Sequence, residues 1–335
     1  MVQTQNLAIP PGEEDQRENE KMTLHCTMVV PCHNEEEAIL GCLDALSAAA
    51  LPEGATWERW IVLDDASTDG TVSLLVDWAA RHPSVPLTIA ESGERLGKAL
   101  ELEAVRSHLA DAGDSSVVMV VGDADCLVEP GALAMLLRPF ALDPTLGVAW
   151  GTSTPGGARR RRLASRFQMT LAEELARGTG PGTIRAEGRL FAIRPSVLEG
   201  FRWEGGFIAD DTQLAAYVQG HSVRSLSVTG ARTFALPVAS YRDFYLQTYR
   251  AYAAERLIAT RSRVEVSEPV SQIQKGWLGV RALFGATRRE PLGLPAYAFA
   301  RGVAAVRNRF APVPFTDCWV SSQSSKQAGK LGGSD

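Results

Sequence analysis

Between residues 27 and 121, short apolar segments rich in β-branched residues alternate with longer segments whose apolar residues recur every three or four positions. The short segments are predicted to be strands, at residues 27–31, 60–63, 86–90 and 116–121. The longer segments are predicted to be helices, at residues 35–50, 71–81 and 98–110. Strands that are apolar on both faces and alternate with amphipathic helices are typical of a parallel sheet covered by helices. The pattern therefore predicts an α/β fold of the nucleotide-binding kind.

The second half of the chain alternates less regularly. Strands are predicted at residues 147–151 and 189–193, and helices at 166–177, 211–219, 241–261, 272–284 and 296–309. The polar and charged residues 1–22 and 321–335 are expected to form a disordered arm and a disordered tail. One large unit with a helical extension at its C-terminal end is the organisation that this pattern indicates.

Composition excludes some classes of partner. The chain has 335 residues, of which 45% are hydrophobic and 22% charged, and its formal net charge is −5. Nucleic-acid binding depends on a basic surface, so the charge argues against a nucleic-acid partner. The five cysteines are scattered and lack the CxxC spacing of a zinc site, and an odd number argues against a disulfide framework. A reducing cytoplasm is the expected compartment.

No membrane span is expected, because no apolar run approaches the roughly 20 residues that a span requires. Residues 1–22 also lack the apolar core of a signal peptide. Residues 277–310 alternate aromatic and aliphatic side chains with arginines. Helices that pack back on the main domain are the preferred interpretation of this stretch. The alternative is a peripheral amphipathic element resting on anionic lipid at the inner face of the membrane.

Acidic residues follow two of the predicted strands. Asp123 and Asp125 lie two positions apart at the end of strand 116–121, so both side chains can lean to the same side. Ligands of parallel sheets lie beyond the carboxyl ends of the strands. Mg²⁺ and Mn²⁺ bind through one or two carboxylates together with phosphate oxygens. The pair therefore predicts a divalent-cation site for a diphosphate, although an acidic turn after a strand is the alternative.

Asp64 and Asp65 follow strand 60–63 as an adjacent pair. Two like charges at the end of a sheet are costly unless a hydrogen-bond donor or a cation answers them. The imide N–H of uracil is such a donor, and Asp65 is the predicted acceptor. Ser67 or Asp69 is expected to cap the helix that follows.

Three more charged residues precede or begin helices. Lys98 follows Gly97 at the start of helix 98–110 and is a candidate phosphate ligand, with a solvated lysine as the alternative. Asp210 and Asp211 precede helix 211–219, where they are candidates for a general base or for a helix cap. A transfer to an alcohol needs one such base and no enzyme nucleophile.

Six segments, taken together and in order, resemble the family 2 glycosyltransferases, which have the GT-A fold. These are VVPCHNEEEAI, IVLDDASTDGT, LGKALELEA, VVGDADCLVEPGAL, GRLFAIRPSVLEG and FIADDTQLAAYVQG. The resemblance covers residues 25–235 and implies a GT-A catalytic domain at 23–236. Its nucleotide-binding half would be 23–126 and its acceptor half 127–236, followed by a helical extension at 237–320.

The resemblance also implies roles for single residues. Pro31, Asn34 and Glu35 would line the nucleotide pocket, and Asp65 would bind a uracil-type base with Asp64 in support. Asp123 would approach the ribose or the metal, and Asp125 would be the metal ligand on the diphosphate.

On the acceptor side, Asp211 matches the aspartate of the family's Glu-Asp base motif, whereas Asp210 stands where glutamate is usual. Which of the two carboxylates is the base therefore stays open. Gly188 and Arg194 match the region that shapes the donor-sugar and acceptor side.

A motif of processive synthases is present only in part. Gln247 and Arg250 have the spacing of a Gln-x-x-Arg-Trp motif, but Ala251 replaces the tryptophan. A chain-extending synthase is therefore disfavoured, and Gln247 and Arg250 are candidate contacts to the acceptor or the pyrophosphate. The run of four arginines at 159–162 is expected to be a solvated loop, or else a loop that meets phosphates or an anionic acceptor.

The predicted function is transfer of one sugar, with inversion, from a UDP-sugar to a hydroxyl of a small-molecule, lipid-linked or glycan acceptor, with Mg²⁺ or Mn²⁺. A nucleotidyltransferase is the first alternative, but the acidic segment after strand 27–31 suits a triphosphate poorly. A nucleotide-sugar-binding regulatory module without turnover is the second.

Overall fold

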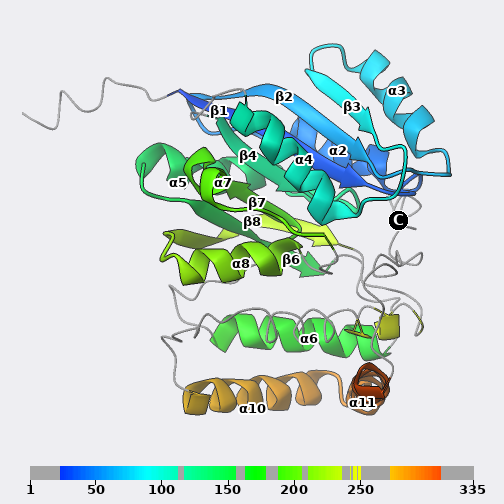
Figure 1. The fold of residues 1–335 in the computed structure, drawn as a ribbon. Coiled ribbons are helices and arrows are strands. Elements are labelled where there is room, and N and C mark those ends of the chain that lie inside the picture. Colours follow the sequence, from blue (N-terminus) through cyan, green and yellow to red (C-terminus); the bar gives the residue numbers. More distant parts are fainter. Residues whose placement is uncertain are drawn as a thin grey trace, which may run out of the picture.

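The computed structural model describes residues 23–111, 117–155, 163–178, 188–205, 210–235 and 272–310, together with 242, 244–246, 248 and 249. The predicted arm and tail, 1–22 and 321–335, and the helix predicted at 241–261 beyond those few positions, lie outside the described residues. Figure 1 shows a sheet covered by helices, with a separate group of helices beside it.

A single eight-stranded sheet has the order β3-β2-β1-β4-β7-β6-β8-β5. Its strands are β1 (Leu24–Cys32), β2 (Ala55–Asp64), β3 (Leu87–Glu91), β4 (Val117–Gly122), β5 (Cys126–Val128), β6 (Val148–Pro155), β7 (Leu190–Ile193) and β8 (Ser225–Ala235). Only β5 and β7 run against the other six strands. The prediction of an α/β fold with a mostly parallel central sheet is confirmed.

Helices cover both faces of the sheet (Figure 1). One face is covered by α2 (Ile39–Ala48), α3 (Thr71–Arg81) and α5 (Ala132–Leu142). The other is covered by α4 (Lys98–Asp111), α7 (Pro195–Gly200) and α8 (Asp210–Gly220). Successive residues of β4 alternate between the two cores, with Val118 and Val120 in one and Met119 and Val121 in the other. This explains why the strands are apolar throughout, since both of their faces are buried.

The remaining described helices form a layer of their own. Helix α6 (Leu163–Gly178) packs against α10 (Gln272–Arg289) and α11 (Gly293–Phe310), below the sheet in Figure 1. Phe167 of α6 is fully buried and its ring lies 5.1 Å from that of Tyr297 in α11. Two ion pairs also join α6 to the end of α10, from Arg166 to Glu290 at 2.7 Å and from Arg289 to Glu174 at 3.2 Å.

The predicted boundary at residue 236 therefore divides a packed unit, because α6 belongs with the C-terminal helices. The preferred interpretation is that residues 277–310 pack against the main domain. In the structure, α10 and α11 pack on α6. Elements β5, α5, α7 and β8 had no predicted counterpart. Among the described residues, no helix combines the length and the apolar character needed to span a bilayer.

Candidate active site

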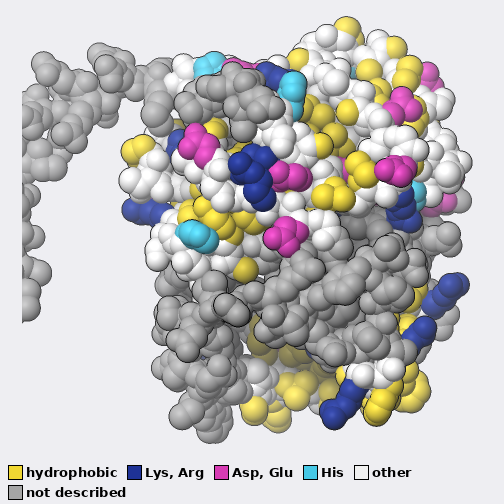
Figure 2. Space-filling view, in the orientation of Figure 1, with side chains coloured by type: hydrophobic (Ala, Val, Ile, Leu, Met, Phe, Trp, Pro, Cys, Tyr) yellow, Lys and Arg dark blue, Asp and Glu magenta, His cyan; other side chains and the backbone are white. Residues whose placement is uncertain are grey.

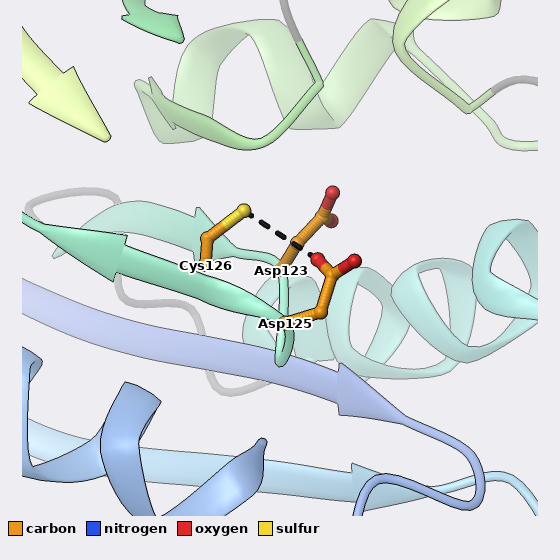
Figure 3. A group of neighbouring side chains, drawn as sticks. All are labelled: Asp123, Asp125 and Cys126. Atoms are coloured by element: carbon orange, nitrogen blue, oxygen red, sulfur yellow. Dashed lines mark hydrogen bonds between the residues drawn. The ribbon is translucent and has the colours of Figure 1, made fainter. Parts of the chain in front are cut away.

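The turn that follows β4 presents the Asp-Ala-Asp motif. Asp123 and Asp125 are half-buried, and both carboxylates project to the same side of the turn (Figure 3). Ligand atoms of Asp123, Asp125 and Cys126 lie within 4.8 Å of one another. The thiol of Cys126 donates a hydrogen bond to Asp125 Oδ1 at 3.5 Å. The predicted two-carboxylate site is therefore assembled in the structure.

The chemistry of this donor set suits a hard divalent cation. Burial, and then the charge of Asp125, raises the pKa of the Cys126 thiol well above its ordinary value, so the sulfur stays protonated. The thiol is the soft member of this donor set, and the two carboxylates supply its hard oxygens. Carboxylate oxygens without thiolate or imidazole suit Mg²⁺ or Mn²⁺. Asp123 and Asp125 thus fit the predicted cation.

Lys98, the first residue of α4, joins the metal carboxylates to the start of α8. Its Nζ lies 2.6 Å from Asp123 Oδ1 and 2.9 Å from Asp210 Oδ2, and it donates to the carbonyl of Gly188 at 3.1 Å. Burial opposes the charge of this ammonium, but Asp123 and Asp210 more than offset it and raise the pKa of Lys98. The alternative of a solvated lysine is therefore wrong, because Lys98 is buried and remains a cation.

The two acidic residues at the start of α8 have different surroundings. Asp210 is buried, and burial raises its pKa to about 6, although Lys98 acts to lower it. Asp211 is half-buried and does not contact Lys98; its Oδ2 accepts the backbone N–H of Gly188 at 3.1 Å. A Cβ atom at position 188 would lie 2.7 Å from that same oxygen, so the approach requires glycine. The structure therefore separates an ion-paired Asp210 from a more accessible Asp211.

These contacts place the metal motif and the base candidates at one end of the sheet. Asp125 adjoins Asp123, Asp123 binds Lys98, and Lys98 reaches Gly188, which binds Asp211. Four separate segments of the chain thus meet there.

Asp65, at the end of β2, is 1% exposed and shapes the turn before α4. Its two carboxylate oxygens accept the backbone N–H groups of Leu96 and Gly97 at 2.6 and 2.9 Å. Gly97 has φ +83°, a left-handed conformation that favours glycine. Asp64 accepts the N–H of Ser67 at 2.9 Å. Both carboxylates of the acidic pair thus accept hydrogen bonds from backbone N–H groups of the protein itself.

The segment after β1 lies against the segment after β2. The Asn34 side chain accepts the N–H of Thr68 at 2.7 Å, and the N–H of Asn34 binds the Ser67 hydroxyl at 2.8 Å. Glu35 is half-buried, and its N–H binds the Thr71 hydroxyl at 2.7 Å. Pro31 is buried in β1. All three predicted nucleotide-pocket residues therefore lie at the carboxyl end of β1, beside that of the parallel strand β2.

Arg194 is the predicted site residue that the structure places elsewhere. It follows the last residue of β7, which pairs with the beginning of β4 rather than with its end. Its guanidinium donates to the carbonyls of Leu146, Phe140 and Asp143 at 2.9 to 3.1 Å. Its prediction as an acceptor-side residue is therefore wrong, because β7 is antiparallel and carries Arg194 away from Gly188.

Other candidates cannot be placed, since Gln247, Arg250 and the arginines at 159–162 lie outside the described residues. Two residues at the site were not predicted. Burial, then Asp65 and Asp64, raise the pKa of Glu101 in α4 to about 9. Arg189 Nη1 lies 3.8 Å from Cys126 Sγ, which brings a second cation to the metal motif. In the sequence, the signal for Glu101 was an acid among the apolar residues of LGKALELEA. The signal for Arg189 was a base before the apolar residues of GRLFAI.

The sequence matches the family model described as "Glycosyl transferase family 2" over residues 27–201. A curated relative, "Probable glycosyltransferase YdaM" of Bacillus subtilis (strain 168), is 27% identical over 223 residues. That match covers 62% of this chain and 50% of the relative, so the chain spans about half the length of the curated relative that it matches.

Two solved structures align with much of this chain. Mannosyltransferase PcManGT from Pyrobaculum calidifontis, in complex with GDP-Man and Mn²⁺, aligns with a TM-score of 0.51 and 23% identity, covering 87% of this chain and 77% of that one. Glucosyl-3-phosphoglycerate synthase from Mycobacterium tuberculosis, with Mn²⁺, UDP and phosphoglyceric acid, aligns with a TM-score of 0.48 and 17% identity, covering 74% of this chain and 81% of that one. At 23% identity, the first of these matches supports the fold.

Proposed function

Because this chain belongs to glycosyl transferase family 2, we propose that it transfers a single sugar from a nucleoside-diphosphate sugar to an acceptor hydroxyl, with inversion. The observation that carries the proposal is the meeting of Asp123, Asp125 and Asp211 through Lys98 and Gly188. This arrangement brings the proposed metal ligands and the proposed base to one place.

Asp211 is the proposed base. Asp210 is buried and ion-paired with Lys98, so it is the less accessible of the two carboxylates. Asp211 is half-buried and leads into the same site. In the proposed reaction its carboxylate takes the proton of the acceptor hydroxyl as that oxygen attacks the anomeric carbon. The bond from the anomeric carbon to the diphosphate oxygen breaks, the configuration inverts, and the nucleoside diphosphate leaves.

Asp123 and Asp125 are the proposed holders of Mg²⁺ or Mn²⁺. A cation bound there would supply positive charge to the departing diphosphate. Lys98 holds Asp123 in place, and its own charge lies next to the metal site. In this proposal Asp210 balances Lys98 and so positions α4 relative to α8, which leaves Asp211 available to the acceptor.

UDP is the proposed donor nucleotide, with its base over the ends of β1 and β2. A carboxylate has about four acceptor positions, and the backbone contacts of Asp65 use two of them. Because Asp65 is almost fully buried, a direct bond to uracil requires the turn at Leu96 and Gly97 to move aside. The proposed acceptor is a small-molecule, lipid-linked or glycan hydroxyl, and the processive reaction is not proposed.

The test is release of nucleoside diphosphate from a panel of UDP- and GDP-sugars with Mn²⁺ and candidate acceptors. For the accepted donor, Asp211→Asn should lower kcat by a factor of about 10³ or more, because the amide cannot take the proton of the acceptor hydroxyl. Donor affinity, measured by calorimetry, should change by less than about threefold.

Asp77→Asn, at an exposed position of α3, is the matched control and should behave like the native chain. A fully active Asp211→Asn variant would remove Asp211 as the base. Failure of every nucleotide sugar to bind or react would contradict the proposed function itself.

A further inference from the structure

Helices α10 and α11 bury small apolar residues and expose large ones. Ala282 and Ala286 of α10, and Ala300 and Ala304 of α11, are buried. The contact with α6 is so close that a Cβ atom on Gly293 would lie 2.7 Å from Phe167. Small side chains thus make the internal packing of this layer.

Several large apolar side chains of α10 and α11 instead point outward. Six of them, between 41% and 79% exposed, define what we call the outer apolar face: Val280, Leu283, Phe284, Val303, Val306 and Phe310. Their spacing of three or four residues places them in one stripe on each helix. Figure 2 shows hydrophobic side chains gathered at the lower edge of the molecule, where Figure 1 places α10 and α11. Exposed apolar side chains that gather in one region of a protein are typical of an interaction surface.

The charge of the same segment is one-sided. Residues 272–310 contain seven basic residues and one acidic residue, Glu290, in a chain whose net charge is −5. Glu290 is ion-paired with Arg166 of α6. Arg281, Arg288 and Arg309 are exposed. The outer apolar face is therefore flanked by uncancelled positive charge.

We propose that the outer apolar face rests on an anionic lipid surface. Amphipathic helices with aromatic and aliphatic residues on one side and Arg or Lys beside them lie in the plane of the interface. Anionic headgroups attract the flanking arginines. Because no described helix is long and apolar enough to span a bilayer, α10 and α11 lie on the membrane rather than across it.

A second copy of this chain is a poorer occupant. A two-fold dimer through the outer apolar face would bring two copies of the same positive segment together. Like charges at a shared interface oppose association, whereas anionic lipid answers them. Charge complementarity thus favours lipid over self-association.

The experiment is co-sedimentation of the full chain with vesicles of phosphatidylcholine alone or mixed with phosphatidylglycerol. We expect binding to the mixed vesicles that weakens as salt is raised, and weaker binding to the neutral ones. The variant Phe284→Ser with Val306→Ser should bind both kinds at least about tenfold less tightly. The variant Arg281→Gln with Arg288→Gln should bind the anionic vesicles about 30-fold less tightly, with little change on the neutral ones.

Matched controls come from α5, on another part of the molecule. Leu142→Ser replaces a residue that is 74% exposed, and Arg138→Gln replaces an exposed arginine. Both should bind within about twofold of the native chain. The proposal is overturned if the native chain ignores anionic vesicles or if the controls lose as much as the variants. It is also overturned if light scattering shows a dimer that Phe284→Ser with Val306→Ser dissociates while lipid binding is unchanged.

Discussion

Glu101 is a buried acid beside two other acids, and this predicts a pH dependence of stability. It is buried in α4, and its Oε1 has no hydrogen-bond partner within the part of the chain that the structure describes. Its pKa is about 9 in the folded chain, against 4.5 for an ordinary glutamate. Between those values the folded state holds a proton that the unfolded state has released. The free energy of unfolding therefore falls as pH rises from about 5 to 9, by at most about 1.4 kcal/mol per pH unit from this group.

Replacing Glu101 with Gln should remove that slope, since glutamine does not ionise. We expect the stability of Glu101→Gln relative to the native chain to increase with pH across this range, measured by urea unfolding at several pH values. Glu94→Gln, an exposed position in the loop before α4, is the control and should keep the native slope. Parallel curves for Glu101→Gln and the native chain would show that Glu101 is ionised when folded.

At the residue scale, the sequence predicted that acidic side chains lie at the ends of strands. Their chemistry and their positions in the chain both indicated this. Asp123 and Asp125 were placed correctly, since the carboxyl ends of parallel strands share one edge of a sheet. The burial of Lys98 and the division between Asp210 and Asp211 could not be predicted. Both depend on a contact between α4 and α8, which are more than 100 positions apart in the chain.

The beginning of α8 comes so close to the turn before β7 that a single methyl group should disturb it. In Gly188→Ala the added carbon would lie 2.7 to 2.9 Å from three atoms of the Asp211 side chain. Relief of the overlap requires Asp211 or the turn to shift. Misplacement by about 1 Å lowers rates by about 100-fold, and overpacking costs about 1–3 kcal/mol of stability. We expect kcat to fall by about 100-fold while the affinity for Mn²⁺ at Asp123 and Asp125 stays within about threefold.

Gly131→Ala is the matched control, because its added carbon meets nothing within 4 Å. It should retain native turnover and stability. Native turnover in Gly188→Ala would show that the close approach to Asp211 is not needed for the reaction.

At the element scale, periodicity predicted the alternating strands and helices up to β4 and missed β5, α5, α7 and β8 in the second half of the chain. Strands β1, β2 and β4 are long or apolar on both faces, and strands β1 to β4 alternate with helices, so the pattern is strong. Strand β5 has three residues, and α5 is apolar nearly all round with Pro139 inside it, so neither gives a clear period. The error over Arg194 has the same origin, because four apolar residues do not reveal the direction of β7.

Across the whole molecule, two packed units perform separable tasks under the two proposals. The sheet and its helices assemble the acidic site at one end, and α6, α10 and α11 present the outer apolar face. The sequence predicted that the C-terminal part was helical, but the amphipathic pattern of α6 does not say which apolar partner it meets. The contact between Phe167 and Tyr297 joins segments separated by more than 100 residues, beyond the reach of local periodicity.

Binding of metal and donor should stabilise the unit that holds the site, because both would bind the folded chain only. A ligand at 100 times its Kd adds about 2.7 kcal/mol, which raises Tm by about 5–10 °C for a domain of this size. We expect Mn²⁺ and UDP together to raise Tm by such an amount in a thermal melt, and EDTA to abolish most of the gain. Asp125→Ala should lose the Mn²⁺-dependent part, since one of two carboxylate ligands is removed, whereas Asp77→Ala on the surface of α3 should keep it. A full gain in Asp125→Ala would place the cation elsewhere.

An unchanged gain in the variant Phe284→Ser with Val306→Ser would show that the acidic site folds and binds independently of the outer apolar face, as the separation of the two packed units requires.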